Sequence, residues 1–145
     1  MARWQRALYQ PAIGLGADGQ RITGCEKHRI LSKEAAREGM VLLKNEGGLL
    51  PFAEGSRIAL FGKGTFDYVK GGGGSGDVTV AYITNLYEGM KKTGKVSICE
   101  ELADFYRENV KKQYAEKKEP GLTTEPEVPE ELYRKASAYT DTAVI

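Results

Sequence analysis

The sequence predicts an α/β fold, a three-layer sandwich in which helices cover a mostly parallel sheet. Short apolar stretches of the kind buried on both faces of a sheet alternate with segments of helical period. Their order of strand, helix, strand, helix and strand is typical of βαβ units. The chain has 145 residues, the size of one domain. Because three strands make a thin sheet, we expect the sandwich to be incomplete and the chain to be part of a longer polypeptide.

The N-terminal part of the chain divides into an arm and a first helix. Residues 1–27 contain Pro11 and several glycines, and we expect them to form an irregular N-terminal arm. From Ser32 apolar residues recur at steps of three and four, which predicts a helix that ends near Asn45. These apolar residues are Ala35, Ala36, Met40, Val41 and Leu43. Residues 28–145 are assigned to the partial α/β-sandwich domain.

Two strands and a helix are predicted next. Residues 57–61 form an apolar run that predicts the first strand, and residues 95–98 predict the second. A helix lies between them, and Gly94 supplies its stop signal. One face of this helix is marked by Ile83, Leu86, Tyr87 and Met90.

The C-terminal part of the chain predicts two more helices and a strand. Residues 100–118 give the clearest helical pattern, with an apolar stripe on one side. The stripe consists of Leu102, Tyr106, Val110 and Tyr114. Three prolines predict a loop over residues 119–129, and a helix follows over about 130–138. A third strand begins at Thr142, and its apolar residues run to the end of the sequence.

The composition argues against several classes of partner. The formal net charge of +1 offers no bulk field for nucleic acid or for an anionic membrane. No apolar stretch approaches the ~20 residues of a membrane span, and no apolar segment follows the basic residues at the N-terminus. We therefore expect a soluble protein of the cytoplasm.

Few residues suit metal binding or acid–base catalysis. The chain holds one histidine, His28, and two distant cysteines, Cys25 and Cys99. This set does not make a metal site, and we expect free thiols, no metal and no cofactor. Carboxylates are plentiful, but no spacing marks a general acid–base pair. We assign no catalytic residue within this chain.

A glycine-rich segment between the first strand and the next helix is the strongest functional signal. Lys70 is followed by four glycines, a serine, a glycine and an aspartate. Because glycine has no Cβ, such a segment can bring bare backbone N–H groups and one hydroxyl close to a polar ligand. Asp67 and Tyr68, which precede Lys70, could assist. The predicted ligand-binding residues are Gly73, Gly74, Ser75, Gly76 and Asp77.

Three kinds of segment share this composition. A flexible linker would separate two domains, but there is no room for a complete domain before it. A dinucleotide fingerprint needs its glycines directly after the strand, whereas residues 62–70 intervene here, and a P-loop needs a Lys-Ser/Thr pair after the glycines. The third kind is a sugar-binding loop, in which Ser75 meets ligand hydroxyls and Tyr68 offers a ring face. The glycines alone leave sugar and phosphate open.

Two stretches resemble a known family. The run Val-Leu-Leu-Lys-Asn-Glu at 41–46, followed by Leu-Leu-Pro-Phe at 49–52, resembles the beginning of the α/β-sandwich domain of glycoside hydrolase family 3. Residues 57–78, which end in Lys-Gly-Gly-Gly-Gly-Ser-Gly-Asp-Val, are similar to that domain's first strand and glycine-serine loop. The resemblance covers residues 28–98 best, and both stretches occur in the expected order.

The resemblance implies part of a retaining, exo-acting β-glucosidase-like enzyme that hydrolyses O-glycosyl bonds of a β-glucoside or oligosaccharide. Such enzymes use an aspartate nucleophile on a (β/α)8 barrel and a glutamate acid/base on the sandwich domain, about 5 Å apart. Only a short arm precedes the sandwich here. The resemblance therefore implies a domain-inverted member, with the barrel downstream and both catalytic carboxylates beyond residue 145. The chain alone is expected to be inactive and to supply substrate contacts through Ser75 and its neighbours.

Two other functions remain open at this point. A non-catalytic carbohydrate-binding or interaction module would keep the scaffold and bind glucose or cellobiose without a barrel. A nucleotide-binding α/β protein would be stabilised by ATP or NAD and not by glucosides.

Overall fold

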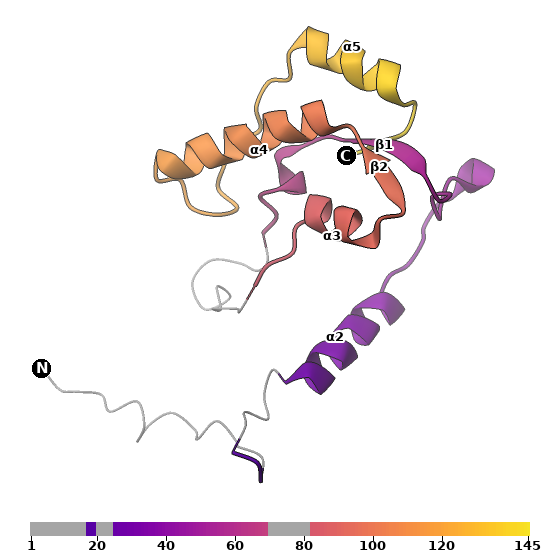
Figure 1. Cartoon of the computed structure of the whole chain (residues 1–145), viewed down its shortest axis with the longest axis vertical. Helices are drawn as coiled ribbons and strands as arrows, with labels where there is room; N and C mark the ends of the chain where they lie inside the picture. The colour runs from indigo at the N-terminus through magenta and orange to yellow at the C-terminus, as the bar shows by residue number, and fades with distance from the viewer. Residues whose placement is uncertain (1–16, 20–24, 70–81) are drawn as a thin grey trace, which may run out of the picture. The chain divides into compact units, whose positions relative to one another are not determined.

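The computed structural model describes residues 17–19, 25–69 and 82–145 (Figure 1). The chain divides into two compact units, Met1–Gly47 and Gly48–Ile145. In the first unit the described residues form helix α2 (Glu26–Glu38). The second unit contains the sheet and the remaining helices.

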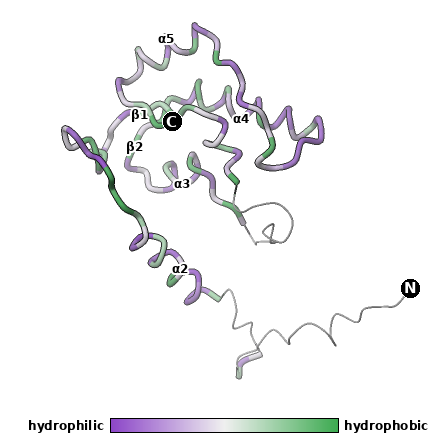
Figure 2. The backbone as a smooth tube through the Cα atoms, turned by 180° about the vertical axis from the view of Figure 1, so that it is seen from behind, coloured by the Kyte–Doolittle hydropathy of each residue, from purple (hydrophilic) through white to green (hydrophobic). Residues whose placement is uncertain are grey.

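Helix α2 ends earlier than the sequence predicts. Gly39 terminates it, and the N–H of Gly39 donates to the carbonyl of Ala35 at 3.0 Å. The predicted continuation to Asn45 is wrong, because residues 40–45 are not helical. Apolar residues that follow one another directly have no helical period, and glycine disfavours a helix interior by about 1 kcal/mol. Figure 2 shows the apolar run as a continuous hydrophobic stretch after α2.

A three-stranded parallel sheet lies at the centre of the second unit. The strands pair in the order β2-β1-β3, with Ser56 opposite Val96 and Ala59 opposite Ala143. Their bounds are β1 (Ser56–Leu60), β2 (Val96–Ile98) and β3 (Ala143–Val144). The three predicted strands are confirmed. Ile58, Ala59 and Leu60 of β1 are at most 2% exposed although their side chains alternate between the two faces, as expected of a strand buried on both faces.

The three predicted helices of this unit are also confirmed. Helix α3 begins after Asn85, whose side chain accepts the N–H of Glu88 at 2.8 Å, and it ends at Gly94, whose φ is +65°. Such an N-cap and a left-handed glycine are common helix boundaries. The bounds are α3 (Leu86–Thr93), α4 (Glu100–Ala115) and α5 (Glu130–Tyr139).

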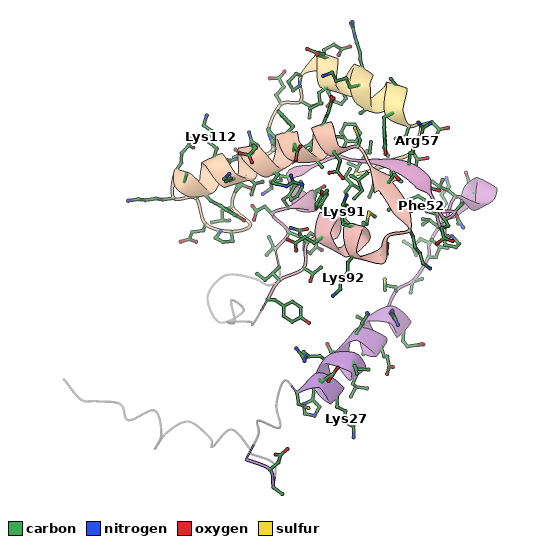
Figure 3. All side chains as sticks on the ribbon, in the orientation of Figure 1. Lys27, Phe52, Arg57, Lys91, Lys92 and Lys112 are labelled. Atoms are coloured by element: carbon green, nitrogen blue, oxygen red, sulfur yellow. The ribbon has the colours of Figure 1, made fainter. Side chains whose placement is uncertain are left out.

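Helices cover both faces of the sheet. Figure 1 shows α4 and α5 on one side of the strands and α3 on the other. Because side chains alternate along a strand, Ala59 packs against α4 and α5, whereas Ile58 and Leu60 pack toward α3. Charged side chains such as Lys92 on α3 and Lys112 on α4 are exposed (Figure 3). The predicted α/β fold is confirmed.

The described residues bear on two further predictions, the absence of a membrane span and the state of the two cysteines. Within them, no helix has both the length and the apolar character needed to cross a bilayer. Cys99 is buried and Cys25 is half-buried, and both are free thiols, as predicted. His28 lies in the first turn of α2.

Candidate functional site

The predicted glycine-serine loop lies outside the described residues. Its five candidate residues all fall between Val69 and Tyr82, where the description of the chain is interrupted. They are Gly73, Gly74, Ser75, Gly76 and Asp77. Their role therefore stays a prediction, and the site is built from the residues that flank them.

A cavity of about 400 Å³ opens at the carboxyl end of the sheet. Phe61 and Gly62 line it where β1 ends, and Ile145 lines it after β3. The start of α3 contributes Asn85 and Leu86. The other lining residues are Gly64, Thr65, Tyr68 and Thr84. Both described flanks of the glycine-rich segment, at Tyr68 and Thr84, thus belong to the wall of this cavity.

The topology of the sheet favours this cavity as the ligand site. Strands β2 and β3 lie on opposite sides of β1, so the order of the strands reverses at β1 and the chain returns to the other side of β1 to form β3. Open α/β sheets bind ligands at the carboxyl ends of their strands, at such a switch point. A second hollow of about 370 Å³, lined by Arg57 and Thr140 among others, lies at the opposite, amino end of β1. We therefore place the candidate site at the carboxyl end.

The lining of the cavity is equipped for binding. Phe61 and Leu86 offer apolar surface, and the exposed Thr84 offers a hydroxyl. Thr65 is 2% exposed, and its hydroxyl donates to the carbonyl of Phe61 at 3.5 Å. Tyr68 is 75% exposed at the rim. Apolar walls with a few placed polar groups are typical of small-molecule sites.

Behind the wall, a buried carboxylate gathers donors from distant parts of the chain. Asp67 is 4% exposed and accepts hydrogen bonds from the Tyr114 hydroxyl and the Gly121 N–H, both at 2.6 Å. The hydroxyl and N–H of Thr123 also donate to it, the N–H at 3.4 Å. The ammonium of Lys63 lies 3.9 Å from the carboxylate. We call these five residues the Asp67 cluster.

Lys63 adds a second link between the cavity wall and the loop after α4. Its ammonium donates to the carbonyl of Gly121 at 3.2 Å and to the carbonyl of Thr123. Its backbone N–H donates to the carboxylate of Glu125 at 2.8 Å. Lys63 directly follows Gly62, which lines the cavity. The loop is therefore fastened at Lys63 and Asp67 to the segment that supplies the wall, although neither residue lines the cavity itself.

The electrostatics of the Asp67 cluster favour one protonation state. Burial opposes ionisation of Asp67, but hydrogen bonds from Thr123, Tyr114 and Gly121 outweigh it and hold the pKa of this carboxyl below its ordinary value. For Tyr114, burial and the neighbouring carboxylate act in the same direction and raise the pKa of the phenol to about 12. At neutral pH Asp67 is therefore an anion and Tyr114 a neutral donor.

The structure separates the two residues that the sequence placed beside the loop. Tyr68 lines the cavity, whereas the Asp67 side chain turns to the loop after α4. Sequence patterns alone did not mark Lys63 or Thr123 as part of the site. Thr123 is 56 positions from Asp67, and no pattern in a single sequence connects residues so far apart. A threonine between prolines gives only a weak signal of a fixed loop.

Comparisons with known proteins identify the family. Residues 40–144 match the family model described as "Glycosyl hydrolase family 3 C-terminal domain". The chain therefore belongs to glycoside hydrolase family 3, as the resemblance of its sequence implied. Beta-glucosidase A of Butyrivibrio fibrisolvens is 54% identical over 146 residues, which cover 100% of this chain and 18% of that protein.

Two solved structures are also similar. Beta-glucosidase 3B from Thermotoga neapolitana, in complex with alpha-D-glucose, is 37% identical with a TM-score of 0.68, over 86% of this chain and 18% of that one. A beta-glucosidase from Paenibacillus barengoltzii is 30% identical with a TM-score of 0.68, over 81% and 13%. The chain thus spans 18% or less of the length of these relatives.

Proposed function

We propose that this chain is part of a retaining, exo-acting β-glucosidase and forms one wall of its substrate cleft. The observation that carries the proposal is the cavity at the β1/β3 switch point, whose wall includes both described flanks of the glycine-rich segment, Tyr68 and Thr84. Similar proteins carry the name beta-glucosidase. One of them was solved with alpha-D-glucose, which supports a glucoside as the substrate.

In this proposal the glycine-serine loop binds the sugar. Gly73, Gly74 and Gly76 offer backbone N–H groups, Ser75 offers a hydroxyl, and Asp77 orients the loop. Residues 1–27 are the arm and 28–145 the partial sandwich domain. The (β/α)8 barrel and both catalytic carboxylates belong to the rest of the polypeptide, which we place in the cytoplasm.

The first observation that tests the proposal is the coding sequence beyond codon 145. A frame that continues into a glycine-rich turn bearing a glutamate, and later into a barrel, supports the hydrolase. A stop codon at that position would favour a stand-alone carbohydrate-binding module instead. Saturable binding of glucose by the 145-residue chain, without hydrolysis, would support that module.

The second test is enzymatic. The complete polypeptide is expected to hydrolyse 4-nitrophenyl β-D-glucopyranoside and to release β-glucose first, as proton NMR of the anomers would show. The 145-residue chain is expected to be inactive. Hydrolysis by the purified short chain would overturn the assignment of the catalytic carboxylates to the rest of the polypeptide.

The role of Ser75 has its own test. Ser75→Ala removes one proposed sugar contact and should raise KM by on the order of tenfold, which corresponds to a net loss of about 1.4 kcal/mol. Ser137→Ala, on the exposed surface of α5, is the matched control and should leave KM unchanged. Equal KM values for the two variants would remove Ser75 from the site.

A further inference from the structure

We propose that Asp67 is a positioning residue for substrate binding: it fixes the cavity wall from behind and sets ligand affinity without contacting the ligand. This inference rests on the function proposed above. Asp67 does not line the cavity, but Thr65 and Tyr68, on either side of it in the chain, do. Its carboxylate is directed instead to Tyr114, Gly121 and Thr123.

The segment 62–68 supplies a large part of the wall and is held through Asp67 and Lys63. Gly62, Gly64, Thr65 and Tyr68 all line the cavity. The first three belong to or border the short 3-10 helix η2 (Lys63–Thr65). Such a short element has little stability of its own. Its position is therefore set by the contacts that it makes with other parts of the chain.

Steric contact reinforces the hydrogen bonds. Gly121 has a φ of +83°, and a Cβ built on it would lie 2.6 Å from Cγ2 of Val69. Val69 is the last described residue before the glycine-rich segment. The loop after α4 therefore contacts the chain on both sides of the wall residue Tyr68, at Asp67 by hydrogen bonds and at Val69 by close packing.

This loop is itself held in place from its other side. Gln113 on α4 is 7% exposed, and its amide nitrogen donates to the carbonyl of Thr124 at 2.9 Å. Its amide oxygen accepts the N–H of Thr124 at 2.8 Å and the ammonium of Lys118, also at 2.8 Å. The loop can therefore act as a fixed support for the segment that it contacts. A wall that shifts away from this support loses part of its contact with the ligand, which weakens binding.

The test compares variants of the complete polypeptide. Asp67→Asn keeps the size of the side chain but replaces one accepting oxygen with an NH2 group. That group cannot accept the hydrogen bonds that Tyr114, Gly121 and Thr123 donate to the carboxylate. Glu119→Gln removes an exposed carboxylate from the same loop and is the matched control. For each protein, KM and kcat for 4-nitrophenyl β-D-glucopyranoside and the melting temperature are measured.

We expect Asp67→Asn to raise KM by on the order of tenfold while kcat changes by less than about threefold, because a positioning role acts on binding. Glu119→Gln should match the wild type. If Asp67→Asn does not fold, Thr123→Val replaces it. That variant removes one hydroxyl donor and keeps the carboxylate. It should also raise KM, but by less than Asp67→Asn.

Two results would overturn the inference. The first is an unchanged KM in a folded Asp67→Asn or Thr123→Val protein. The second is a loss of kcat and melting temperature at constant KM, which is the signature of a purely structural residue. In both cases the proposed function stands if the wild type is active. A wild type without β-glucosidase activity would overturn the proposed function, and this inference with it.

Discussion

The hydroxyl of Tyr114, in the last turn of α4, donates a 2.6 Å hydrogen bond to Asp67, which precedes it by 47 residues. This bond joins the longest described helix to the segment that leaves the sheet after β1. The same carboxylate holds Gly121 and Thr123. One buried anion thus ties together three stretches of chain around the rear of the candidate site.

Acid is expected to weaken the Asp67 cluster. In the folded state the pKa of Asp67 lies below the ordinary value of 3.8. The unfolded state, in which the carboxyl has that ordinary value, therefore binds the proton more tightly. The stability contributed by ionised Asp67 is therefore present above about pH 4 and is lost as the pH falls through the lowered pKa. Melting temperatures of wild type and Asp67→Asn from pH 7 to pH 2 test this. The difference between them should shrink on acidification, and a constant difference would contradict the prediction.

Gly121 is expected to tolerate no side chain. Gly121→Ala carries the cost of a left-handed φ and also a collision with Val69, and should destabilise by about 2–4 kcal/mol. Gly55→Ala is the matched control, because its φ is +81° with open space around it, and it should cost about 1 kcal/mol. The double variant Gly121→Ala/Val69→Ala should recover part of the difference. Equal destabilisation by Gly121→Ala and Gly55→Ala would exclude the collision.

The core under α4 depends on Leu102. Its side chain is 0% exposed and packs with Ala59 of β1. Leu102→Ala should lower the free energy of unfolding by about 2–5 kcal/mol, since it removes buried methyl groups and leaves a cavity. Leu122→Ala, at a site 67% exposed, should change it by less than about 0.5 kcal/mol. Urea unfolding measures both, and similar losses would contradict the core assignment.

The start of α3 depends on Asn85. Its side chain accepts the N–H of Glu88 at 2.8 Å, and it also lines the cavity. Asn85→Ala should destabilise by about 1 kcal/mol, whereas Asn85→Asp should keep most of the stability because aspartate is also a good N-cap. Amide hydrogen exchange of residues 86–93 reports the effect. Unchanged protection in Asn85→Ala would show that packing alone holds this helix turn.

Local patterns predicted most of the second unit correctly. The apolar run at 57–61 and the stripe on α4 each follow from the period of one element. Gly94 marked the end of α3 because few residues other than glycine adopt a positive φ. The same method failed at residues 40–45, where an apolar run without helical period was joined to the preceding helix.

The sequence alone determined the fold class, the position of each strand and the family, because periodicity, turn residues and motif order are local properties that one chain displays directly. Only the tertiary structure decided that Tyr68 faces the cavity while Asp67 faces the loop after α4. It also decided that Lys63 and Thr123 belong with Asp67. Such pairings depend on how separate elements pack in space, and a chain read in order carries no period that connects residues about 60 positions apart.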